Sequence, residues 1–333
     1  MPFALGPKAT AGSYRLAAYE TIGSTSTEAL NRAKAGDEGR LWVVAKAQTA
    51  GHGRRGRAWE TPSGNLAASL LVGSVLGQPN AAKLGFAAGL ALDQAIRALL
   101  SGSSAFSIED RSSSNPLILR RGSDAVGIAS KGRPECAGNA SLRASRLAFG
   151  SHLSMREGGS SPHAETTAEL MEHRGSFQLR LKWPNDVLVD GAKIAGILLE
   201  ALTLPDGVSR VVIGIGVNVL HAPKDLPYPA TSLCGCGVEV TPEALFEALA
   251  EAWVQQEALW DGGRGFPAIR NRWLERAAGL GAPIVVHMGE QVFRGLFETI
   301  DEEGRLIVRA ADGSAQPITA GDVHFGAAAT MRN

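Results

Sequence analysis

The sequence predicts an α/β (α+β) fold followed by a small C-terminal β-barrel, and three observations support this prediction. Up to about residue 275, short apolar strand candidates alternate with longer segments of helical periodicity. Between residues 283 and 325 the chain instead contains short strand candidates separated by glycine-containing turns, which is typical of a small barrel. Hydrophobic residues make up 44% of the chain and charged residues 20%, so an ordinary buried core can form.

The first hundred residues predict a mixture of helices and strands. A helix is expected to begin within residues 24–28, because Thr25 and Glu28 have the spacing of a capping box and an apolar face follows. The elements expected next are a buried strand at Leu41–Ala45, a glycine- and arginine-rich loop at Gln48–Trp59, a strand at Leu66–Val75 and a helix at Ala81–Leu100.

The composition changes at residue 101. Residues 101–176 are rich in serine, glycine and arginine and show no sustained periodicity. Such a segment buries too little apolar surface to offset its ordering entropy, so we expect a mostly disordered insertion with one short helix near Glu165–His173.

Regular structure is predicted again from Phe177. Apolar and polar residues alternate through Trp183, and the Asp190-Gly191 dipeptide predicts the turn of a hairpin. The further elements expected are strands at Val187–Val189, Ile194–Glu200 and Val211–Val219 and helices at Thr241–Trp260 and Phe266–Glu275, then strands at Pro283–Met288, Gln291–Thr299, Arg305–Ala310 and Gln316–Phe325. We therefore expect a catalytic domain at 1–278, carrying the insertion, and a C-terminal domain at 279–333.

Charge and cysteine content exclude several classes of protein. The chain has 33 Lys+Arg and 33 Asp+Glu, a balance that argues against a protein that coats nucleic acid or an anionic membrane. Its three cysteines form neither a disulfide framework nor two spaced zinc-binding pairs, so reduced thiols are expected. The first 19 residues lack the apolar core of a signal peptide, and no apolar run has the length of a membrane span. A cytoplasmic protein is expected.

The segment Gly51-His52-Gly53-Arg54-Arg55-Gly56 matches the pattern of a dinucleotide-binding loop, but its context does not. That motif should open a helix and be followed about 20 residues later by an acidic residue, whereas no Asp or Glu lies between Glu60 and Asp93. We favour a flexible cationic loop whose glycines allow close backbone approach and whose arginines suit phosphates or carboxylates. The alternative is a solvated basic loop.

A second cluster is Lys182-Trp183-Pro184-Asn185-Asp186, which stands at the end of a predicted strand because Pro184 cannot donate to a sheet. Asp186 is a candidate ligand for a phosphate-bound magnesium ion, and Lys182 is a candidate phosphate contact. Taken alone, the cluster is better explained as an Asn-Asp turn beside a surface lysine.

Two further groups carry functional side chains. Lys193 stands at the mouth of an apolar strand, where it either reaches water or faces a phosphoryl or carboxylate group. The strand Ile213–Val217 contains Gly214 and Gly216, which mark close approach by a ligand or by neighbouring backbone, and Asn218 follows at its end.

Together these segments resemble the successive motifs of biotin–protein ligases, in the same order. The resemblance rests on Ser24-Thr25-Ser26, on Gln48 to Arg57, on Lys182 to Asp186, on Lys193 to Gly196 and on Gly214 to Asn218. It covers about residues 18–325 apart from the insertion. It implies a mixed sheet with flanking helices like that of class II aminoacyl-tRNA synthetases and lipoate ligases, and an SH3-like C-terminal barrel.

The resemblance also implies a reaction and a set of site residues. ATP and biotin would be substrates, Mg²⁺ would assist, biotinyl-5′-AMP would form, and a lysine of a biotin carboxyl carrier protein would receive biotin. Lys193, Arg54 and Asp186 would be catalytic. The biotin site would comprise Ser24, Thr25, Ser26, Gln48, Gly51, His52, Gly53, Arg54, Lys193 and Gly196. The nucleotide site would comprise Arg54, Arg55, Trp59, Lys182, Asn185, Asp186 and Asn218, with Asp186 on the metal.

This chain departs from the family in two places. His52 stands where arginine is common, and the insertion replaces a short connection. About 23 residues precede Ser24, which is too few for the helix-turn-helix domain of some family members, so no DNA binding is expected. The expected oligomeric state is a monomer or a weak homodimer. Two alternative functions are a lipoate ligase and a non-catalytic binding module. Measuring pyrophosphate release with biotin and with lipoate distinguishes these two functions from a biotin ligase.

Overall fold

The computed structural model describes residues 2–73, 78–101, 107–109, 118–120, 178–205, 207–224 and 226–325. Its main feature is a seven-stranded mixed sheet with the strand order β1-β2-β3-β9-β8-β7-β6. The first two strands are parallel and the other neighbours are antiparallel. The strands are β1 (Arg15–Ile22), β2 (Leu41–Gln48), β3 (Leu66–Val72), β6 (Leu179–Lys182), β7 (Asp186–Val189), β8 (Ala192–Thr203) and β9 (Ser209–Val217).

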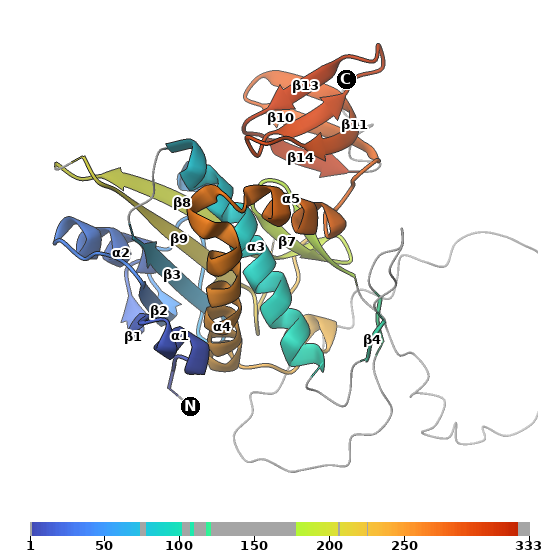
Figure 1. Cartoon of the computed structure of the whole chain (residues 1–333). Helices are drawn as coiled ribbons and strands as arrows, with labels where there is room; N and C mark the ends of the chain where they lie inside the picture. The colour runs from blue at the N-terminus through green and yellow to red at the C-terminus, as the bar shows by residue number, and fades with distance from the viewer. Residues whose placement is uncertain are drawn as a thin grey trace, which may run out of the picture.

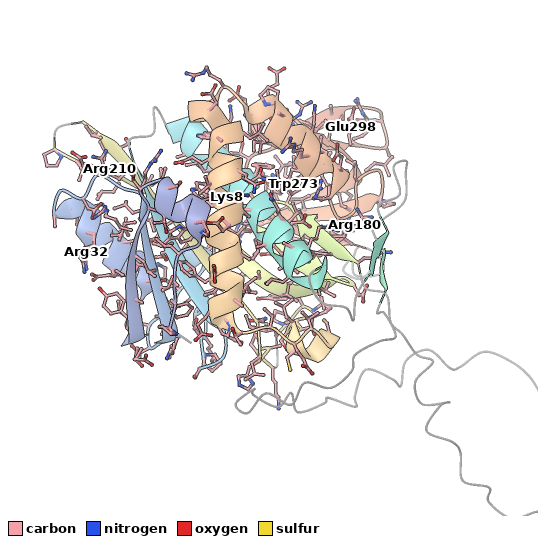
Figure 2. All side chains as sticks on the ribbon, turned by 60° about the horizontal axis from the view of Figure 1, so that its bottom comes forward. Lys8, Arg32, Arg180, Arg210, Trp273 and Glu298 are labelled. Atoms are coloured by element: carbon pink, nitrogen blue, oxygen red, sulfur yellow. The ribbon has the colours of Figure 1, made fainter. Side chains whose placement is uncertain are left out.

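Helices cover both faces of this sheet, which confirms the predicted fold class. The helices are α1 (Pro7–Ala11), α2 (Thr25–Lys34), α3 (Gln78–Ser101), α4 (Pro242–Trp260) and α5 (Phe266–Glu275). Figure 1 shows α3 and α4 packed together across one face, with α1 against α4, and Figure 2 shows the same pair side by side after rotation.

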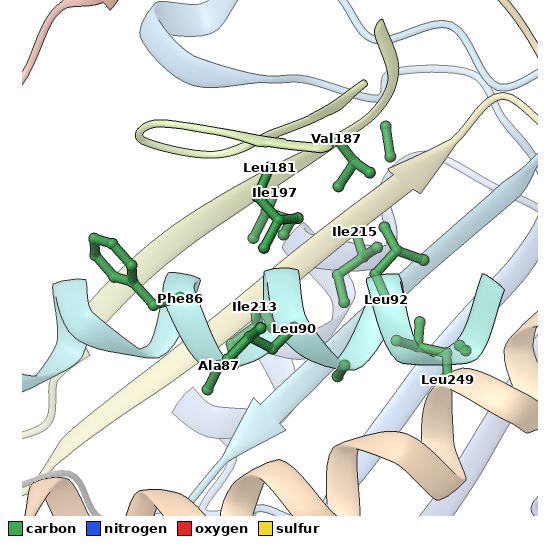
Figure 3. Packing of buried hydrophobic residues seen from close by; sticks show 14 of the residues in the cluster. Phe86, Ala87, Leu90, Leu92, Leu181, Val187, Ile197, Ile213, Ile215 and Leu249 are labelled. Carbon is green, nitrogen blue, oxygen red and sulfur yellow. The ribbon is translucent and has the colours of Figure 1, made fainter. Parts of the chain in front are cut away.

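The alternation of side chains along the strands explains how two faces are buried at once. In β2, Trp42 and Val44 pack into the large core beneath α3 and α4, whereas Leu41 and Val43 pack against α2 in a smaller core. On the larger side, Phe86, Ala87 and Leu90 of α3 lie against strand residues such as Leu181 and Ile213 (Figure 3). This burial on both faces fixes the register of the central strands.

Residues 283–325 form a five-stranded antiparallel sheet, which we call the C-terminal unit. Its order is β13-β12-β11-β10-β14. The strands are β10 (Pro283–Met288), β11 (Gln291–Ile300), β12 (Leu306–Arg309), β13 (Ala315–Ile318) and β14 (Asp322–Phe325). The unit lies next to α5 (Figure 1), and the buried Trp183 donates its indole N–H to the Gly304 carbonyl at 3.2 Å.

Most predicted elements are present, and the corrections are local. The elements α1 and β1 were not expected, and Gln316–Phe325 is two strands rather than one. Helix α2 is capped one residue earlier than predicted, because the Ser24 hydroxyl accepts the Thr27 N–H, while the Thr25 hydroxyl binds elsewhere. The hairpin turn is as expected, with Asp190 and Gly191 both at positive φ.

Most of the predicted insertion lies outside the described residues, including the helix expected near Glu165–His173. Within it, β4 (Ser107–Glu109) pairs antiparallel with β5 (Ile118–Arg120), a pair that was not predicted. The two elements that border the insertion lie close together. The Arg97 guanidinium, near the end of α3, donates a hydrogen bond of 3.3 Å to the carbonyl of Leu179, the first residue of β6.

The expectation of three reduced cysteines is only partly met. Cys236 is a free thiol, whereas Cys234 is disulfide-bonded, and Cys136 lies outside the described residues. In the described part of the chain, no helix is long and apolar enough to cross a membrane.

Candidate active site

A cavity of about 1000 Å³ lies between the mixed sheet and the C-terminal unit. It collects nearly all of the predicted site residues from segments that are far apart in the sequence. The predicted residues that line it are Ser24, Thr25, Ser26, Gln48, His52, Gly53, Arg54, Arg55, Trp59, Lys182, Asn185, Asp186, Lys193 and Gly196.

One part of the cavity wall is a cluster of buried hydroxyl groups. The Thr25 and Ser26 hydroxyls lie 2.8 and 3.0 Å from the hydroxyl of Ser69, a residue of β3. The Gln48 side chain accepts the Thr25 N–H at 2.8 Å and donates to the Thr61 hydroxyl at 3.0 Å. Because hydroxyls both donate and accept, this wall suits a compact polar group that offers both kinds of partner.

The adjoining floor is made of glycines covered by an indole ring. A Cβ atom placed on Gly216 would lie 2.3 Å from the Trp59 Nε1 atom, and one on Gly196 would lie 3.3 Å from the same ring. The sheet therefore accepts the flat Trp59 ring directly against its backbone only because these positions lack side chains.

Lys193 is the central charged group of the cavity. Its ammonium lies 2.6 Å from an Asp186 carboxylate oxygen, and both side chains are more than four-fifths buried. The Trp59 and Tyr228 rings lie 5.5 and 5.6 Å from this ammonium. Lys193 lies near the start of β8, just after the exposed Asp190-Gly191 turn, and its ammonium faces the cavity rather than open water.

Two more cations face the same space. Burial lowers the pKa of the Lys182 ammonium, and Lys193 adds to this effect while Asp186 opposes it. Burial likewise lowers the pKa of Arg54, whose guanidinium donates to the Asn185 side-chain oxygen at 3.2 Å. Cations that have lost part of their hydration are well prepared to bind an anion.

The segment Gly51–Arg57, which we call the arginine loop, is a tight turn closed by its own backbone. The Gly53 N–H donates to the Arg57 carbonyl at 2.7 Å, and the Trp59 N–H donates to the Gly51 carbonyl at 2.9 Å. His52, the departure from the family pattern, lies 3.3 Å from the Glu200 carboxylate on β8. Histidine at this position thus contacts the mixed sheet.

Two predicted residues lie outside the cavity wall. Asn218 is buried and donates its side-chain amide to the Thr231 carbonyl at 3.1 Å. Gly51 is enclosed, since a Cβ atom there would lie 2.4 Å from the Trp59 carbonyl oxygen. Both residues hold neighbouring segments in place in this structure.

Several lining residues were not predicted. Ser69 is a polar residue within an otherwise apolar strand, a signal that was available in the sequence. Tyr228 and the C-terminal unit's His287, Arg294, Asp322 and His324 also line the cavity. Nothing in their local sequence marks them, because their position depends on how the C-terminal unit docks.

The charged groups fit a magnesium ion that arrives with phosphates. Asp186 provides one carboxylate in the cavity, which matches the usual coordination of Mg²⁺ by one or two carboxylates plus phosphates and water. Among the described residues there is no cluster of three or more His, Cys, Asp or Glu side chains that would bind a metal ion independently.

Known proteins are similar to this chain in both of its parts. Residues 18–129 and 163–218 match the biotin/lipoate A/B protein ligase family, and residues 279–326 match the biotin protein ligase C-terminal domain. The chain is 36% identical over 309 residues to a biotin–[acetyl-CoA-carboxylase] ligase of Paracoccus denitrificans, an alignment that covers 91% of this chain and 97% of that protein.

Two solved structures have a similar fold. The biotin protein ligase from Aquifex aeolicus in complex with biotin and ATP has a TM-score of 0.60 and 18% identity, covering 94% of this chain and 99% of that chain. The biotin protein ligase from Leishmania major in complex with biotinyl-5-AMP has a TM-score of 0.51 and 22% identity, covering 92% and 99%. The family matches and the Paracoccus relative agree in both parts of the chain, and on these grounds the chain belongs to the biotin protein ligase family.

Proposed function

We propose that the chain forms biotinyl-5′-AMP from biotin and ATP and then transfers biotin to a lysine of a biotin carboxyl carrier protein. The observation that carries this proposal is that one cavity joins a hydroxyl-lined wall to a group of poorly hydrated cations, Lys182, Lys193 and Arg54. The uncharged polar ring of biotin fits the hydroxyls, and the cations fit its carboxylate and the phosphates.

The first step joins the carboxylate to the nucleotide. A biotin carboxylate oxygen attacks the α-phosphorus of ATP, and pyrophosphate leaves with the bonding electrons. Lys193 would orient the carboxylate and stabilise charge on the α-phosphate, with Lys182 and Arg54 beside the phosphates. Mg²⁺, when bound with ATP, would neutralise phosphate charge, and Asp186 would provide its protein ligand.

The second step is an acyl transfer. The unprotonated carrier lysine attacks the carbonyl carbon of the mixed anhydride, AMP leaves, and the amine loses a proton. Ser24, Thr25, Ser26, Gln48, Gly196 and the arginine loop would hold the biotinyl part. Asn185, Arg55 and Trp59 would contact the nucleotide, and Asn218 would support this site from outside the cavity wall. We propose a cytoplasmic enzyme that acts as a monomer or weak homodimer without DNA or membrane partners.

The test is pyrophosphate release by the purified chain with ATP, Mg²⁺ and either biotin or lipoate. Release that depends on biotin supports the proposal. Because the matched family includes lipoate ligases, pyrophosphate release that depends on lipoate alone would indicate a lipoate ligase instead. No release with either compound, under conditions where biotin binds, would indicate a binding module.

Replacing Arg54 by glycine should make the enzyme release its intermediate. The Arg54 side chain is half-buried in the cavity wall and donates a hydrogen bond to the Asn185 side-chain oxygen, so its loss removes a charged contact that is worth about 1.5 kcal/mol or more. We expect biotinyl-5′-AMP to leave roughly tenfold faster and to label lysines of unrelated proteins. Arg264→Gly, which changes an exposed arginine outside the cavity, is the control. Labelling that stays confined to the carrier protein would rule out a retention role.

Deleting residues 103–173 and joining the ends with a short flexible linker should leave biotin-dependent pyrophosphate release within about twofold of wild type. The contact between Arg97 and Leu179 keeps the two borders close, and loop-closure entropy grows only logarithmically with length. Residues 130–162 fall between the two matched parts of the family. Steady-state kinetics of both half-reactions would check this. Loss of the first would mean that the insertion supports the catalytic domain, and loss of transfer alone would indicate a docking arm for the carrier.

A further inference from the structure

The arginine loop divides its three guanidinium groups between two parts of the molecule. Arg54 points into the cavity and donates to Asn185. Arg55 and Arg57 instead reach the C-terminal unit, where both donate to the same oxygen of Asp322, at 2.9 and 3.3 Å. Two cations more than 260 positions away in the sequence thus share one carboxylate.

Asp322 is the rigid partner in this contact. It opens β14 and faces His287 of β10 in the register, and the next residue, Val323, is buried in the core of the unit. Gly321 packs so closely that a Cβ atom there would lie 2.6 Å from the Val286 side chain. The arginines are the adaptable partners, with 49% and 62% of their side chains exposed against 35% for Asp322.

The same strand also borders the cation group of the cavity. The Lys182 ammonium lies 5.7 Å from the Phe325 ring, and Lys182 contributes to the lowered pKa of His324, after burial. A loop that is joined to β14 is therefore joined to a wall of the cavity, and the ion pairs of Arg55 and Arg57 with Asp322 make this connection.

We propose that Asp322 is a positioning residue that fastens the arginine loop over the cavity, so that the C-terminal unit controls how long the reactive intermediate is retained. Arg55 then has this fastening role in addition to its proposed place in the nucleotide site. The retention part rests on the proposed function, whereas the fastening itself does not. Exposed ion pairs contribute little to global stability, so removal of this carboxylate should loosen the loop without unfolding the protein.

Trypsin tests the fastening without any substrate, because it cuts after the arginines that Asp322 engages. We expect Asp322→Asn to increase the rate of cleavage after Arg55 and Arg57 about threefold to tenfold, the factor that loss of one or two such pairs allows. Fragments are identified by mass spectrometry, and Asp322→Glu should restore much of the protection. Glu298→Gln is the matched control, since Glu298 pairs with Arg309 in the same unit, is similarly exposed (36%) and does not line the cavity. It lies in the C-terminal unit in Figure 2.

Adenylate release tests the retention. Asp322→Asn should release biotinyl-5′-AMP faster by a similar factor. In a chain that already carries Arg55→Ala and Arg57→Ala, it should add nothing. The proposal is overturned if Asp322→Asn shows the wild-type rate of loop cleavage or the wild-type rate of adenylate release. It is also overturned if Asp322→Asn speeds adenylate release in the triple variant as much as it does in the otherwise wild-type chain. If wild type forms no adenylate, the proposed function fails, and the trypsin result still decides whether Asp322 fastens the loop.

Discussion

Lys193→Ala is expected to lower the rate of biotinyl-5′-AMP formation about 10²- to 10³-fold, the usual cost of removing one preorganised charge-stabilising group. The ammonium lies 2.6 Å from Asp186 inside the cavity, where low hydration strengthens its interaction with developing negative charge. Without it, the repulsion between the biotin carboxylate and the α-phosphate is offset only by the remaining cations, Lys182, Arg54 and Mg²⁺. Biotin-dependent pyrophosphate release under saturating ATP measures the effect.

Two further variants separate chemistry from folding. Lys193→Met keeps most of the apolar stem beside Trp59 and Tyr228 but removes the charge, so it should be as inactive as Lys193→Ala. Lys46→Ala removes a lysine that pairs with Glu20 away from the cavity and should retain normal activity. If Lys193→Ala folds and releases pyrophosphate at a near-normal rate, the proposed role of Lys193 is wrong.

Gly216→Ala is expected to lower the same activity about 100-fold, although it adds a single methyl group. The new Cβ atom would lie 2.3, 2.4 and 2.7 Å from three atoms of the Trp59 ring, closer than real Cβ contacts occur. The ring must leave the sheet, which deforms the cavity between β8, β9 and the arginine loop; misplacement of a site by about 1 Å costs roughly that factor. Pyrophosphate release and biotin binding by calorimetry would measure the loss.

The mechanism of this loss can be separated from a general intolerance of alanine. Gly23→Ala, next to the Ser24 cap, meets no atom within 4 Å and should be active. A chain with Trp59→Ala should lose little more activity when Gly216→Ala is added, because the atoms that clash are then gone. Strong additivity of the two substitutions would show that Gly216 acts through another contact.

The sequence alone predicts those elements whose local pattern of apolar and polar residues matches the faces that they bury in the folded protein. The helix at Phe266–Glu275 and the strand at Pro283–Met288 begin and end where predicted. By contrast, β1 was missed because it is an edge strand with no fully buried residue, and α1 because five residues carry little periodicity. An edge strand that buries little of its surface needs no regular pattern of apolar residues, so its sequence gives little sign of it.

The same distinction holds at the site. Fourteen of the 16 residues that the family resemblance assigns to the site line the cavity, because the motifs lie at or next to elements that the local pattern already defines. The shared carboxylate at Asp322, the burial that lowers the pKa of Lys182, and the pairing of Lys193 with Asp186 were decided only by tertiary packing. The reason is physical: hydration and ion pairing depend on distances between residues far apart in the chain, and no local sequence pattern encodes how the C-terminal unit docks on the sheet.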